Sequence, residues 1–102
     1  MRELHFDVTG QLLRRNKQCD FENIVRGSDN YLCLVFHFNQ EWKETKRVIS
    51  FYDVDGKQTN EIVQDRVTVP VNVTHGSMFY FELTGKSNKT RITTNRAYIE
   101  QT

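Results

Sequence analysis

The feature that most constrains this chain is a two-residue alternation of apolar and polar side chains along most of its length. Residues 4–8 read Leu-His-Phe-Asp-Val, residues 31–38 are largely apolar on both faces, and residues 79–83 place Phe, Phe and Leu on one face. A period of two is typical of β-strands, and no segment sustains the longer period of a helix. We expect at most one helical turn, near residues 40–45. The sequence therefore predicts an all-β fold.

Turn signals divide the alternating segments into about seven or eight short strands. Thr9-Gly10, Asp55-Gly56 and His75-Gly76 are turn pairs, and Asp-Gly in particular favours a tight hairpin. The predicted strands cover residues 4–8, 11–15, 31–38, 47–54, 57–64, 67–73, 77–83 and 90–100, with a further short edge strand at 24–25. Short, regularly spaced strands predict an antiparallel β-sandwich that forms one domain over residues 1–102.

Two positions interrupt the regular alternation. Pro70 falls within the predicted strand at residues 67–73 and removes one ladder donor, which favours an edge position or a switch between sheets. In the last strand the inward positions are 92 and 94, and then 97 and 99. This change of parity predicts a β-bulge near Asn95-Arg96.

Charge and composition exclude several partner classes. The chain has 102 residues and a net charge of +1, without the basic surface of a nucleic-acid binder, so we expect no nucleic-acid partner. No apolar run is long enough to cross a bilayer, and none follows Met1, so we expect neither membrane insertion nor a signal peptide. Cys19 and Cys33 are too few for a disulfide framework, and we expect both to be reduced.

No pattern of catalytic or metal-binding residues appears. His5, His37 and His75 do not lie beside a serine or cysteine in a nucleophile motif. Residues 53–56 read Asp-Val-Asp-Gly like the start of a calcium loop, but the later oxygen ligands do not follow, so a hairpin turn is the better interpretation. The cysteine and histidine spacing does not fit zinc. We therefore expect no enzymatic activity, no metal and no cofactor.

Aromatic side chains are the remaining candidates for binding. Tyr80 and Met78 lie on the face opposite the inward row of residues 79–83, and this pair is a possible protein interface. Trp42 is a possible aromatic ligand contact, although a cap over the end of the core is the alternative interpretation. The alternative interpretation of these aromatic residues, which also include Tyr31, Tyr52 and Tyr98, is that most of them are core or half-buried.

Five sequence stretches carry a family resemblance. They are Ser-Asp-Asn-Tyr-Leu at residues 28–32, Phe-His-Phe at 36–38, Glu-Trp-Lys at 41–43, Val-Pro-Val at 69–71 and Arg-Ile-Thr-Thr-Asn-Arg at 91–96. Their order resembles a small β domain at the N-termini of tail, baseplate and adsorption-associated proteins of siphophages that infect Gram-positive bacteria such as Bacillus. The likeness extends from about residue 4 to residue 99.

The resemblance implies a receptor-binding-protein-like β-sandwich without enzymatic activity or cofactor. It favours a structural or protein-binding module of the phage tail tip or host-adsorption apparatus. The expected partners are other tail or baseplate proteins, or further copies of the chain in a homo-oligomer. Two alternatives stay open, namely a module that binds cell-wall carbohydrate and an effector that binds a host protein. The expected location is the virion tail region or the host cytoplasm.

Overall fold

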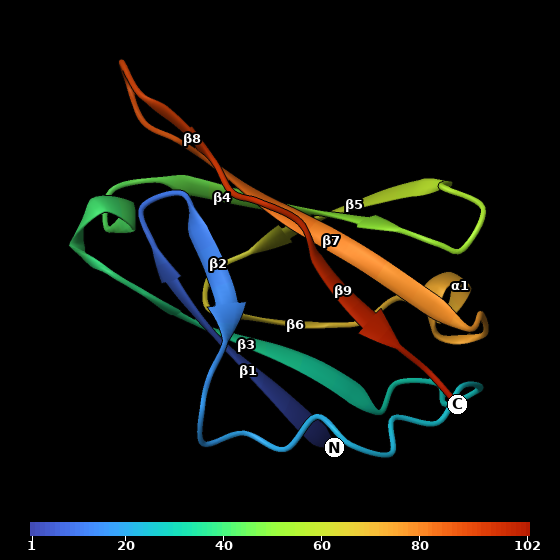
Figure 1. Ribbon diagram of the computed structural model, residues 1–102. Coiled ribbons are helices and arrows are strands. Elements are labelled where there is room, and N and C mark those ends of the chain that lie inside the picture. The colour runs from blue at the N-terminus through green and yellow to red at the C-terminus, as the bar shows by residue number, and fades with distance from the viewer.

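A computed structural model describes all 102 residues as a mostly β chain in two sheets, with about 50% of residues in strands (Figure 1). The first sheet has the strand order β2-β1-β3-β6, and the second has β5-β4-β7, with β8 and β9 both pairing with β7. The elements are β1 (Arg2–Thr9), β2 (Leu12–Arg15), β3 (Leu32–Phe38), a 3-10 helix (Gln40–Trp42), β4 (Lys46–Tyr52), β5 (Gln58–Val63), β6 (Arg66–Thr68), α1 (Val71–Thr74), β7 (Met78–Lys86), β8 (Arg91–Thr93) and β9 (Ala97–Glu100). The prediction of a mostly β chain with a helical turn near residue 40 is confirmed, but the limit of one helical turn is wrong, because α1 is a second one.

The core lies between the inner faces of the two sheets. Phe6 on β1 and Phe36 on β3 both meet Phe81 on β7, with ring centroids 5.1 and 5.9 Å apart. These rings belong to a cluster of 18 buried apolar residues that includes both inner faces. Burying one such side chain stabilises the fold by roughly 1.5–3 kcal/mol, so the alternation in the sequence fixes which face turns inward.

The prediction of an antiparallel fold is wrong for one strand pair. Strands β1 and β3 run parallel, in a register that pairs Arg2 with Leu32 and Val8 with Phe38. Parallel neighbours need a long connection, which β2 and the irregular segment at residues 16–31 provide. The predicted edge strand at residues 24–25 does not form. Ile24 is instead buried in the core, and its carbonyl oxygen accepts a hydrogen bond from the Thr102 N–H.

The strand predicted at residues 67–73 is also wrong beyond its first residues. Strand β6 ends at Thr68, Pro70 follows with extended backbone angles, and Val71 begins the short helix α1. A proline cannot donate to a ladder, so the sheet pairing stops before it. The strand before Pro70 does lie at a sheet edge, since β6 pairs with β3 alone, but Pro70 itself lies outside the sheet.

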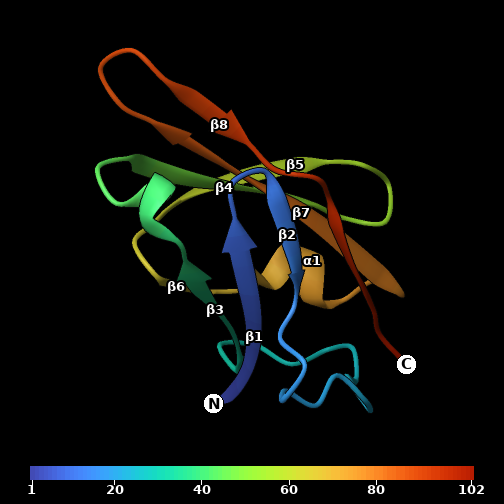
Figure 2. The ribbon, with the colours of Figure 1, turned by 60° about the vertical axis from the view of Figure 1, so that its left-hand side comes forward.

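The predicted bulge near Asn95-Arg96 is confirmed by the pairing register. Thr93 pairs with Thr84, and Ala97 pairs with Phe81. The last strand therefore advances four residues while its partner β7 advances three. The extra residue divides the last strand into β8 and β9. The hairpin that joins β7 to β8 extends beyond the rest of the molecule, whereas both termini lie at the other end (Figure 2).

Candidate functional site

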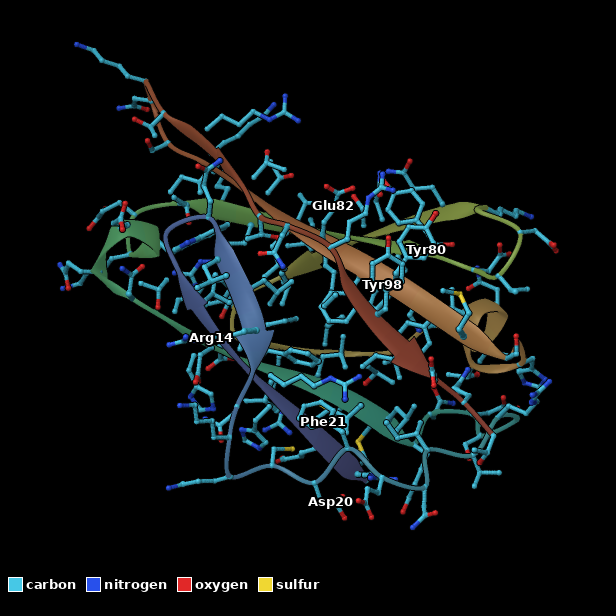
Figure 3. The ribbon with its side chains drawn as sticks, in the orientation of Figure 1. Arg14, Asp20, Phe21, Tyr80, Glu82 and Tyr98 are labelled. Atoms are coloured by element: carbon cyan, nitrogen blue, oxygen red, sulfur yellow. The ribbon has the colours of Figure 1, made fainter.

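Three tyrosines form a continuous row across the outer face of the second sheet, called here the tyrosine row. Tyr52 on β4 lies directly opposite Tyr80 on β7, and Tyr80 lies opposite Tyr98 on β9. The Tyr52 and Tyr80 ring centroids are 4.8 Å apart at an interplanar angle of 8°. The Tyr80 and Tyr98 centroids are 5.0 Å apart at 29°. Figure 3 shows Tyr80 and Tyr98 together beside the β7 and β9 ribbons.

An ion pair between Arg96 and Glu82 lies against the tyrosine row, beside Tyr52 and Tyr80. The Tyr52 hydroxyl donates to Glu82 Oε1 over 3.0 Å, and Arg96 Nε lies 3.6 Å from the same oxygen. The Arg96 guanidinium lies 5.1 Å from the Tyr52 ring centroid and 5.2 Å from the Tyr80 centroid, within cation–π range. Burial, followed by the hydrogen bond to Glu82, raises the pKa of Tyr52 above its ordinary value.

The two predicted interface residues both lie on this face. Tyr80 is half-buried between its tyrosine neighbours, and Met78, two residues earlier in β7, lies on the same face opposite Glu100. The most accessible ring of the row is Tyr98, with 51% of its surface exposed. The pair predicted from the sequence is therefore part of a larger surface whose outermost aromatic is Tyr98.

Trp42 is placed in the core and not on a binding surface. Its exposed fraction is 0%, its ring packs against Phe38 at 5.1 Å, and its Nε1–H donates to the Gly10 carbonyl oxygen over 2.8 Å. A fully covered indole has no face to offer a ligand. The interpretation of Trp42 as a cap over the end of the core agrees with this geometry, and the interpretation as a ligand contact does not.

Sequence reasoning did not assign Tyr52, Tyr98, Glu82 or Arg96 to the site. A signal for Tyr52 and Tyr98 was present, because each falls on the outward parity of its own strand. Their alignment with Tyr80 depends on the pairing register, which alternation alone does not supply. Arg96 reaches the row through the bulge, so its direction could not be read from a regular strand pattern.

A second polar cluster lies on the outer face of the first sheet. His5 Nδ1 and His37 Nε2 are 2.8 Å apart, and His5 Nε2 lies 3.0 Å from Glu3 Oε1. The guanidinium of Arg66 meets the other Glu3 oxygen at 2.6 Å. Hydrogen bonds from Arg66 and His5 lower the pKa of Glu3 below its ordinary value. Both ring nitrogens of His5 are thus engaged within the cluster.

The cysteines of this region do not pair with a histidine base. Cys19 Sγ accepts from the backbone N–H of His5 at 3.3 Å, and Cys33 is buried at 2% exposure with Arg66 at 3.5 Å. Both thiols are free. No group of three or more His, Cys, Asp or Glu side chains is arranged to hold a metal ion.

The residues that resemble a calcium loop build a turn. Asp53 Oδ1 accepts from the backbone N–H groups of Asp55 and Lys57 at 2.9 and 2.8 Å, and Gly56 adopts φ +82°. The Asp53 carboxylate is thus used by the hairpin between β4 and β5.

None of the helices has the length and apolar character needed to pass through a bilayer.

Comparison with known proteins identifies no relative. No family model matches the chain, and no curated protein or solved structure matches it either. The resemblance to the phage tail and adsorption domain therefore stays a prediction from motif order.

Proposed function

We propose that this chain is a non-enzymatic protein-binding module, a β-sandwich that engages its partner through the outer face of the second sheet. The tyrosine row is the observation that carries the proposal. Tyrosine, methionine and arginine are enriched in protein interfaces, and tyrosine and arginine contribute a large share of interface hot spots. Tyr98, Met78 and Arg96 bring these three residue types to one face. Stacking also restricts the rings before binding, which reduces the entropy cost of association.

The ring geometry favours a protein partner over cell-wall carbohydrate. A sugar ring stacks on an open aromatic face, but Tyr80 has Tyr52 on one face and Tyr98 on the other. The Arg96 guanidinium lies 5.1 Å from the Tyr52 ring centroid and 5.2 Å from the Tyr80 centroid. The Tyr80 ring is thus covered on both faces, and the Tyr52 hydroxyl is already bonded to Glu82. Titration with teichoic acid or peptidoglycan fragments tests the carbohydrate alternative, and millimolar binding that is lost on Tyr98→Ala would support it.

We further propose, from the order of the sequence motifs, that the partner belongs to the tail-tip or host-adsorption apparatus of a phage. Mass spectrometry of purified virions tests this assignment. Finding the chain in stoichiometric amounts would support it. Its absence from the particle would leave a host protein or a second copy of the chain as the partner.

Site-specific photo-cross-linking tests the protein-binding role directly. A benzoylphenylalanine replaces Tyr98 in one variant and Tyr31 in the other, because these rings have matched exposures of 51% and 50%. Tyr31 precedes β3 and lies outside the tyrosine row. Both variants are irradiated in the native host during expression, and the adducts are identified by mass spectrometry.

The proposal expects one defined protein adduct at position 98 that is absent at position 31. Adduct identity separates a virion protein, a host protein and a second copy of the chain. Equal labelling at both positions, or no adduct at position 98, would contradict the proposal.

A further inference from the structure

On the outer face of the second sheet, at the end away from the tyrosine row, basic side chains from three strands form a row that is called here the basic row. Lys46 on β4 lies directly opposite Lys86 on β7, and Lys86 lies opposite Arg91 on β8. Lys46 shares the outer face with Tyr52, which is six residues further along β4, a separation of about 20 Å at the usual rise of a strand. Like charges directly opposite one another destabilise a sheet, so this arrangement opposes folding.

The cations of the basic row have no partner within the chain. Lys46, Lys86 and Arg91 are all exposed, and none forms a salt bridge or a side-chain hydrogen bond. Lys43 lines a hollow together with Lys46, and Lys89 lies two residues before Arg91 in the chain; both are exposed. Glu44 is an acidic side chain lining the hollow beside Lys46, but it pairs with none of them within 4.0 Å. The charge is therefore available to an external anion.

An apolar groove adjoins the basic row. Val48 and Ile62 lie opposite each other on β4 and β5, and Ile62 is 84% exposed. They line a hollow of about 540 Å³ together with Lys43 and Lys46. Its lining contains no acidic residue, and of its three basic residues Lys43 and Lys46 are unpaired while Arg47 donates to backbone carbonyl oxygens of the chain. An apolar anchor beside unpaired cations defines a partner that is itself both apolar and acidic.

We infer that this end of the sheet binds an extended acidic segment of a protein partner, with an apolar side chain beside Val48 and Ile62 and carboxylates facing the basic row. The inference rests on the proposed protein-binding role of the same sheet face. Charge complementarity of this kind raises the rate of association and excludes basic competitors. The binding face then has an aromatic end at the tyrosine row and a cationic end at the basic row.

A nucleic acid fits this surface less well. Phosphate contacts with only a few cations give weak binding at physiological salt, and the net charge of the chain is only +1. Single-stranded binding also uses open aromatic faces on which bases stack, whereas Tyr80 is covered on both sides. Bases offer no aliphatic side chain for the groove between Val48 and Ile62.

Fluorescence anisotropy with defined probes tests the inference. The probes are a labelled peptide of alternating Glu and Val, its Lys–Val counterpart and an oligothymidylate of similar length. The test variant is Lys46→Glu with Lys86→Glu, and the matched control is Lys17→Glu with Lys57→Glu, which makes the same change in net charge at exposed loop positions. Thermal unfolding confirms that each variant is folded.

The inference expects the Glu–Val peptide to bind and the Lys–Val peptide not to bind. Reversal of Lys46 and Lys86 should weaken binding at least about tenfold, and the control pair should change it less than about twofold. Added salt should weaken binding, because exposed charges are screened. Equal binding of both peptides, or an unchanged affinity in the test variant, would overturn the inference.

Two further outcomes separate this inference from the proposed function. If the oligothymidylate binds more tightly than the Glu–Val peptide and loses affinity in the same variant, the basic row recognises nucleic acid and the acidic-segment assignment fails. If no peptide binds while the adduct at position 98 forms, the protein-binding role stands and the chemistry assigned to the partner is wrong.

Discussion

The side-chain amide of Asn95 pairs with the backbone of Leu13 in both directions. The Leu13 N–H donates to Asn95 Oδ1 over 2.7 Å, and Asn95 Nδ2 donates to the Leu13 carbonyl oxygen over 2.9 Å. One amide thus takes the place of a neighbouring strand and joins β2 of the first sheet to the bulge of the second. Because Arg96 follows directly, this pairing also fixes the segment that carries the guanidinium to the tyrosine row.

Replacing Asn95 with alanine should destabilise the fold. Two hydrogen bonds to one residue's backbone are lost, each contributing about 0.5–1.5 kcal/mol, so the expected loss in the free energy of unfolding is about 1–3 kcal/mol. Asn88→Ala in the exposed β7–β8 turn is the control, with an expected change within about 0.5 kcal/mol. Urea denaturation measures both. Equal midpoints for the two variants would show that the Asn95 amide contributes nothing to joining the sheets.

Replacing Gly85 with alanine should disturb the cap formed by Trp42. A Cβ at this position would lie 2.6 Å from Trp42 Cζ3, whereas at Gly76 the nearest atom is 3.3 Å away. Overpacking of this kind costs about 1–3 kcal/mol, so Gly85→Ala should lower stability more than Gly76→Ala does. In a double-mutant cycle, Trp42→Phe should reduce the cost of Gly85→Ala because the smaller ring leaves room. Additive effects would contradict the predicted contact.

Tyr52 should titrate above the ordinary tyrosine pKa of about 10. Protonated Tyr52 therefore contributes to the free energy of unfolding. This contribution is complete at a pH below the ordinary pKa and is lost as the pH rises through the higher pKa of the folded state. Glu82→Gln should lower the pKa of Tyr52 without restoring it fully, since burial persists. Glu100→Gln, on the exposed end of the same face, is the control. Carbon NMR of labelled tyrosine rings measures the titration, and an equal pKa in both variants would rule out the Glu82 contribution.

Alternation in the sequence was sufficient to predict which side chains turn inward, because it depends only on the geometry of a single strand. Phe79, Phe81 and Leu83 are buried as expected. The bulge was predictable for the same reason, from a change of parity along one segment. The parallel pairing of β1 and β3 was not, because it depends on how the segment at residues 16–31 folds back, and that segment carries no alternation.

The functional surface was harder to predict than the core. Tyr52, Tyr80 and Tyr98 lie on three strands, and only the observed pairing register aligns them. The same holds for the basic row, whose members are distant in sequence. Trp42 shows the opposite case, where a residue type that is common in ligand sites is buried by local packing against Phe38 and Gly10.

The affinity of the cross-linked partner for two matched serine variants is the most direct test of the tyrosine row as a binding surface. Tyr98→Ser removes the most exposed ring of the row, and Tyr31→Ser removes an equally exposed ring elsewhere. The expected result is a loss of at least about tenfold in affinity for Tyr98→Ser and less than about twofold for Tyr31→Ser. Full affinity in Tyr98→Ser, or a greater loss in Tyr31→Ser, would contradict the assignment of the binding face.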